Sequence, residues 1–167
     1  MKRWYVYALI GLIFGVFDWF FLDWLAKDFG PSLGENQFIV VPVMLGLNYG
    51  IWLVPLIPVC FYEAHQAKSI KGPAFTGTLT WSSAILSYYV YYAILFSLGR
   101  LPNLEYFNIL SHEFKEVRAI YWRWFNSIIL FQLIEWIPIA IIGGGLIGVI
   151  IWWITNKIID RNFTSEV

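Results

Sequence analysis

Long apolar runs without a single charged residue constrain this chain more than any other feature. The run from Phe38 to Tyr62 contains no Asp, Glu, Lys or Arg, and neither does the run from Trp136 to Ile154. A helix over the second run is roughly 28 Å long at 1.5 Å per residue, which is close to the thickness of the hydrocarbon core of a bilayer. Both runs therefore predict helices that cross a membrane.

The composition favours the same class. Of the 167 residues, 59% are hydrophobic and only 13% are charged, whereas about 25% of the residues in a soluble domain are charged. The 11 basic and 11 acidic residues cancel, so the chain has no basic field for nucleic acid, and no nucleic-acid partner is predicted. Cys60 is the one cysteine, which excludes an intrachain disulfide.

Two further apolar segments bring the predicted spans to four. We expect the first span at about residues 4–25, before the helix-stopping pair Gly30 and Pro31. The third, at about 74–98, follows Gly72 and Pro73 and is rich in hydroxyl groups, which places it inside the bundle. The other two spans are expected at about 38–62 and 136–154. The 38–62 span should be kinked by its prolines, Pro42, Pro55 and Pro58.

Residues 103–126 show a different pattern, that of an amphipathic helix. Apolar residues recur there at steps of three and four, and the polar residues include His112, Glu113, Glu116 and Arg123. We expect this helix to lie at the membrane surface between the third and fourth spans. The predicted fold is therefore an all-α integral membrane protein, with four transmembrane helices and one interfacial helix in a single domain over residues 1–167.

The distribution of basic residues predicts the orientation. Four spans place both termini on one side of the membrane, together with six of the 11 basic residues. Most of the remaining five lie in the amphipathic segment rather than in a short loop, so the positive-inside rule favours cytoplasmic termini. The six are Lys2, Arg3, Lys68, Lys71, Lys157 and Arg161.

Asp18 is the strongest candidate for binding a ligand or ion. It follows Phe17 and precedes Trp19, and apolar surroundings penalise a charged carboxylate unless a cation or hydroxyl groups approach it. A structural salt bridge to Arg100 or Arg123 is the alternative interpretation. The sequence places Asp18 only about 7.5 Å deeper than Asp23, which we expect at the membrane boundary.

Two other polar residues join Asp18 and Asp23 as binding candidates. Asn48 is the one strongly polar group of the second span. Glu135 is interfacial if the fourth span begins at Trp136, and intramembrane if it begins near Phe125; the interfacial interpretation is favoured.

Motifs for metal binding, cofactors and catalysis are weak. His112 and Glu116 have i,i+4 spacing, but a metal site also needs a converging carboxylate, and a solvated helix face is the commoner explanation. Gly143, Gly145 and Gly148 follow no strand, so no dinucleotide site and no cofactor is predicted. Gly144 and Gly148 are better explained as a GxxxG pair that packs closely against another helix, whose chain the sequence leaves open. No GxSxG or HExxH motif favours an enzyme.

Three functions from different classes remain. The first is a membrane-embedded component that binds or transports a solute, cation or lipid. The second is a non-catalytic accessory subunit of a larger membrane complex, and the third, least favoured, is an intramembrane enzyme. Four spans are few for a complete carrier. We therefore expect a homo-oligomer, or association with other membrane subunits, besides contact with the lipid bilayer.

Overall fold

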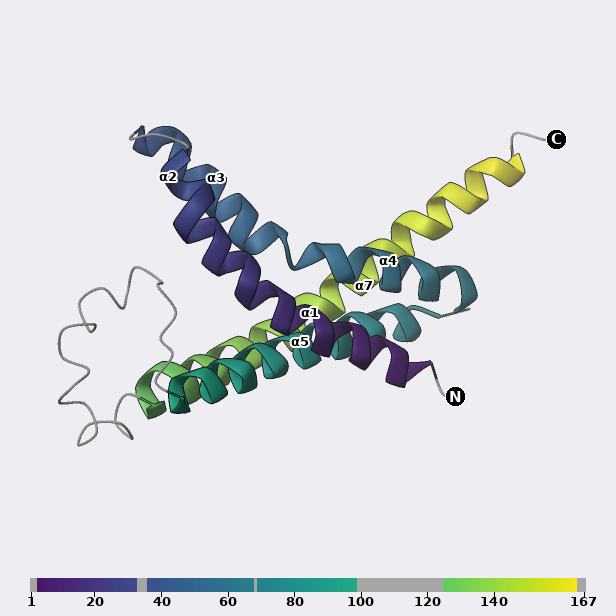
Figure 1. Ribbon diagram of the computed structural model, residues 1–167. Coiled ribbons are helices and arrows are strands. Elements are labelled where there is room, and N and C mark those ends of the chain that lie inside the picture. The colour runs from purple at the N-terminus through teal and green to yellow at the C-terminus, as the bar shows by residue number, and fades with distance from the viewer. Residues whose placement is uncertain (1–2, 33–35, 68, 99–124, 165–167) are drawn as a thin grey trace.

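The computed structural model describes residues 3–32, 36–67, 69–98 and 125–164, and the elements in these ranges are all helices (Figure 1). Three continuous helical segments are long and apolar enough to cross a membrane, and a bent pair of helices makes a fourth if it is one span. The all-helical character predicted from the sequence is thereby confirmed, as is the presence of several helices apolar enough to span a membrane. The elements are α1 (Trp4–Trp24), the π-helical turn η1 (Leu25–Phe29), α2 (Gly30–Ser32), α3 (Gln37–Gly50), α4 (Leu53–Gln66), α5 (Lys71–Ser97), the π-helical turn η4 (Phe125–Leu130) and α7 (Phe131–Thr164).

Helix α5 lies at the centre of the bundle, in contact with α1, α4 and α7. This position confirms the interior placement expected for the hydroxyl-rich third span. Gly11 packs on Thr80 and Gly15 on Ala84, so α1 and α5 run parallel. Helix α7 runs antiparallel to α5, and the beginning of α1 and the end of α7 lie on the same side of the bundle (Figure 1).

Glycines bring the helices into backbone contact. A Cβ atom on Gly11 or Gly15 would clash with a carbonyl oxygen of α5. A Cβ atom on Gly144 would stand 2.7 Å from the carbonyl carbon of Gly77, and one on Gly148 would stand 2.5 Å from the carbonyl carbon of Pro73. The Gly144 and Gly148 face therefore packs against α5 of its own chain. The Gly11 and Gly15 pair has the same four-residue spacing, although the sequence analysis did not single it out.

The second predicted span is broken between α3 and α4 and not at Pro42 or Pro58. Helices α3 and α4 meet at 40° around Ile51 and Trp52, just before Pro55. Pro55 falls in the first turn of α4, where backbone nitrogens have no helical partner, so the chain breaks upstream of it. Pro42 and Pro58 lie within continuous helices.

Three helix boundaries differ from the sequence-based expectation. Helix α5 begins at Lys71 rather than at 74, because Gly72 and Pro73 occupy its first turn, where proline loses no hydrogen bond. The π-helical turn η1 carries the first helix past the expected end at 25. The helix that carries the fourth predicted span includes residues before Trp136, back to Phe125 where the described residues resume, since a single glutamate such as Glu135 does not interrupt a helix.

Residues 103–124 of the interfacial helix expected at 103–126 lie outside the described residues. Its polar side chains His112, Glu113, Glu116 and Arg123 are in that part. The prediction that this helix lies at the membrane surface therefore stays a prediction.

Candidate functional site

Asp18 lies within the bundle and is 0% exposed. The apolar helical segment that carries it runs from Trp4 to Phe29, so Asp18 is about 21 Å from one end and about 16 Å from the other. Along this helical segment, Asp18 lies near the middle. The expectation that Asp18 lies about 7.5 Å deeper than Asp23, with Asp23 at the membrane boundary, stays a prediction.

The face of α1 that carries Asp18 packs against α5. Gly15, nearly one turn before Asp18, contacts Ala84 and Ser87 of α5. Trp19 contacts Tyr91 of α5, with the two ring centroids 5.5 Å apart. Asp18 is therefore held at the level of the tyrosines that follow Ser87, and two of them, Tyr88 and Tyr89, are buried within electrostatic range of its carboxylate.

Both carboxylate oxygens of Asp18 are buried, and neither has a hydrogen-bond partner among the described residues. The nearby serines of α5 bond back to their own helix instead. Ser83 Oγ donates to the carbonyl oxygen of Thr80 and Ser87 Oγ donates to that of Ala84, each at 3.0 Å. Serine in a helix commonly makes such local bonds. Arg100 and Arg123, the cations considered for a salt bridge, lie outside the described residues.

The other three binding candidates have different surroundings. Asp23 is half-buried and pairs with Lys27 on its own helix, with 2.8 Å between Oδ2 and Nζ. Asn48 is half-buried on α3, and Glu135 is exposed on α7, ten residues inside the segment that begins at Phe125. Whether Glu135 is interfacial or intramembrane stays a prediction, because a helix of 33 residues is longer than a bilayer is thick and its start does not mark the membrane boundary.

Tyr89 connects the levels of Asp18 and Glu135. It lies within electrostatic range of both carboxylates, and its hydroxyl group donates to Oε1 of Gln132 at 3.4 Å. The structure thus brings Asp18, Tyr89 and the Gln132 to Glu135 turn of α7 to one level of the bundle. Asp23, with its own counter-ion on α1, stands apart from this group. Among the described residues, no three His, Cys, Asp or Glu side chains gather as metal ligands.

A second polar cluster surrounds Glu63, which is not among the binding candidates predicted from the sequence. The Tyr7 hydroxyl donates to Glu63 Oε2 at 2.6 Å, and Arg3 Nη1 lies 3.8 Å from the same oxygen. Arg3 also donates to Gln66. The signal was present in the sequence, because Leu56, Val59, Cys60 and Glu63 follow the i, i+3, i+4, i+7 pattern of one buried face.

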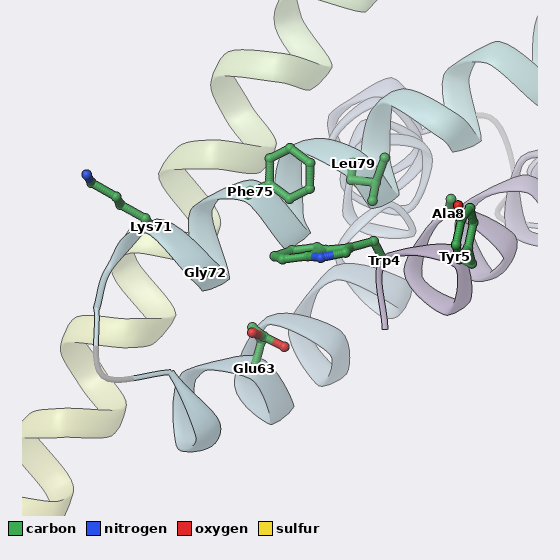
Figure 2. Close-up of a pocket in the computed structure, with 8 residues that line it drawn as sticks. All are labelled: Trp4, Tyr5, Ala8, Glu63, Lys71, Gly72, Phe75 and Leu79. Atoms are coloured by element: carbon green, nitrogen blue, oxygen red, sulfur yellow. The ribbon is translucent and has the colours of Figure 1, made fainter. Parts of the chain in front are cut away.

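A hollow of about 810 Å³ opens beside Glu63, between the beginnings of α1 and α5 and the end of α4 (Figure 2). His65 is exposed and contacts Phe61, with ring centroids 4.3 Å apart. It therefore lies on another side of α4 from Glu63, as the two-residue separation requires.

Comparison of the chain with protein-family models, with curated proteins and with solved structures finds no match. The features that can indicate a function are the two buried carboxylates, Asp18 and Glu63. Asp18 has no partner among the described residues, and a carboxyl group in that state can hold a proton or ligate a small cation. Glu63 has partners at one oxygen and a hollow beside it.

Proposed function

We propose that this chain is an integral membrane protein that binds a proton or a small cation at Asp18, as the binding component of a transport system. The observation that carries this proposal is the complete burial of both Asp18 oxygens without a hydrogen-bond partner among the described residues. An isolated ionised carboxylate in such a place is strongly disfavoured. A bound proton or a bound cation removes that penalty.

The surroundings of Asp18 favour a small ligand over a large solute. Asp18 does not line the hollow of about 810 Å³, and the α1 and α5 backbones touch at Gly15, less than one turn away. The hydroxyl groups of Tyr88 and Tyr89 lie in electrostatic range and could share a cation or hydrogen-bond to a protonated carboxyl group. Ionisable groups in the interior of a membrane bundle commonly mark paths of ions or protons.

Proton and cation flux into proteoliposomes tests the proposal. Vesicles with the purified protein and an internal pH dye receive a potassium diffusion potential, and sodium uptake is measured in parallel. Asp18→Asn keeps the shape of the side chain and should abolish flux of the transported ion. Asp23→Asn is the matched control on the same helix and should retain it, because Asp23 lies outside the Asp18 group.

The outcomes separate the proposal from its rivals. If vesicles with wild-type protein show the same flux as empty vesicles, the protein does not transport the ion on its own. If flux is absent and Asp18→Asn instead weakens association with copurifying membrane proteins, the accessory role takes its place. Equal flux in wild-type protein and Asp18→Asn removes Asp18 from the mechanism.

One observation favours the accessory role as a second candidate. Helix α3 has no buried residue, Phe38 is 93% exposed, and a Cβ atom on Gly46 or Gly50 would meet nothing within 4 Å. Glycines four residues apart allow close helix association in membranes. Native mass spectrometry of protein extracted gently from its own membrane reports the copy number and any other subunit, and recovery of a monomer alone contradicts this role.

A further inference from the structure

The hollow beside Glu63 lies at the end of the bundle formed by the first turns of α1 and α5 and the last turns of α4. Its volume of about 810 Å³ falls within the range of sites for small molecules. Figure 2 shows Trp4 beside Phe75 in its wall, with the Glu63 carboxylate on the other side of the Trp4 ring. This site is separate from Asp18, which is about 17 Å farther along α1 than Tyr7, the partner of Glu63.

The walls of the hollow are aromatic and aliphatic. Trp4 and Phe75 meet edge to face with ring centroids 4.6 Å apart, and Tyr5 and Leu79 line the same hollow. Trp4, Tyr5 and Phe75 are exposed. These surfaces suit a hydrocarbon chain, and the faces of Trp and Tyr also attract organic cations.

Glu63 supplies a negative charge in this apolar site. The residue is only 8% exposed, and Tyr7 and Arg3 approach its Oε2 atom. Its Oε1 atom points toward Gly72, which lines the hollow, and would lie 3.3 Å from a Cβ atom there. Among the described residues no hydrogen bond reaches Oε1, so this oxygen can accept one from a ligand.

The chemistry of these groups selects an organic ammonium over a metal ion. Divalent metal ions need several oxygen or nitrogen ligands, and the described residues place only one carboxylate here. An ammonium group needs one strong acceptor, and an adjacent aromatic face adds to its binding. Lys71 stands at the rim with its amine directed away from Glu63 (Figure 2), where it can contact an anionic group attached to the same ligand.

We propose that this hollow binds the ammonium group of an amphiphile, with Glu63 as the acceptor, Trp4 and Phe75 around the adjoining carbon atoms, and Lys71 at the rim. Two sources share this chemistry. One is the phosphoethanolamine head of a membrane lipid, whose phosphate would meet Lys71. The other is a free alkylamine.

Native mass spectrometry of the full-length protein in detergent tests this assignment. The probes are phosphatidylethanolamine against phosphatidylglycerol with the same acyl chains, and dodecylamine against dodecanol. Wild-type protein should bind the ammonium member of a pair at least about tenfold more tightly, as expected for one charged hydrogen bond. If the protein prefers phosphatidylethanolamine and also dodecylamine, the lipid head is a ligand. If it prefers dodecylamine but does not distinguish the two lipids, the ligand is a free amine.

Two variants locate the site. Glu63→Gln keeps the shape and an acceptor for Tyr7 and should remove the preference, whereas Glu135→Gln, the same change on exposed α7, should keep it. Ala8→Phe fills the hollow without changing charge and should block binding, which serves as the test if Glu63→Gln does not fold. No preference in wild-type protein, or a preference unchanged by Glu63→Gln or Ala8→Phe, overturns the proposal. Proton or cation flux through Asp18 is a separate readout, so either proposal can fail alone.

Discussion

Replacing Gly144 by alanine should separate α5 and α7, which are in backbone contact at this glycine. The new Cβ atom would stand 2.7 Å from the carbonyl carbon of Gly77 and 2.9 Å from the nitrogen of Thr78. Ordinary van der Waals contact begins at 3.4 Å, so α5 and α7 must move apart by several tenths of an ångström. Backbone atoms cannot rotate away as a side chain could. The hydrogen bond from Thr78 Oγ1 to the carbonyl oxygen of Ile141, 3.0 Å long, lies beside this contact and should lengthen.

The expected magnitude follows from two opposing effects. Overpacking of a well-packed interior costs about 1–3 kcal/mol. Alanine in place of glycine within a helix contributes about 1 kcal/mol in the opposite direction. Gly46→Ala is the matched control, because a Cβ atom there meets nothing within 4 Å and only the second effect applies. The free energy of unfolding should therefore be about 1–3 kcal/mol lower in Gly144→Ala than in Gly46→Ala.

Reversible unfolding in mixed micelles with increasing dodecyl sulfate, followed by circular dichroism, measures this difference. Gly11→Ala offers a second test of the same reasoning at the α1 and α5 contact, where the new Cβ atom would clash with the carbonyl oxygen of Thr80. Equal unfolding free energies for Gly144→Ala and Gly46→Ala would refute close packing between α5 and α7.

Three further predictions concern hydrogen bonds and ion pairs. Tyr7→Phe removes the 2.6 Å bond to Glu63 and should lower the unfolding free energy by about 1–3 kcal/mol; no change in the same assay contradicts the bond. Thr78→Val removes the bond between α5 and α7 and should cost about 0.5–1.5 kcal/mol, with a smaller loss in a Gly144→Ala background where the bond is already stretched. Asp23→Asn breaks the ion pair with Lys27 on the helix surface and should change stability by at most about 0.5 kcal/mol; a loss of several kcal/mol would show that Asp23 has a further partner.

The helical class follows from the sequence because hydrocarbon leaves backbone groups no partner but each other. Uncharged runs such as Phe38–Tyr62 therefore predict spanning helices without knowledge of any contact. The interior position of α5 was also predictable, because hydroxyl groups need neighbours other than lipid. The direction of those hydroxyl groups was not, since Ser83 and Ser87 bond to their own helix.

Helix ends were less predictable because local breakers act only in some positions. A proline stops a helix at its end but is tolerated in a first turn. The sequence does not show which of the two applies to Pro73. The same limit applies to the first helix, which continues past Trp24 through the π-helical turn η1.

The contact between Tyr7 and Glu63 joins residues 56 positions apart, and the sequence contains no direct signal for such a pair. The helical pattern of α4 does show that Glu63 shares a face with Leu56 and Cys60. That pattern could have marked Glu63 as a buried carboxylate, although it could not identify Tyr7 or the hollow.

The protonation state of Asp18 in the absence of metal cations tests the central claim most directly. Infrared spectra of the protein in lipid, in buffer whose only cation is tetramethylammonium, should contain a protonated-carboxyl band that shifts in D₂O. Asp18→Asn should remove this band and Asp23→Asn should retain it. If sodium or potassium is the ligand, adding that cation should remove the band as well. An ionised Asp18 in this buffer, which lacks metal cations, would contradict the account. The carboxylate would then have a counter-ion within the protein itself.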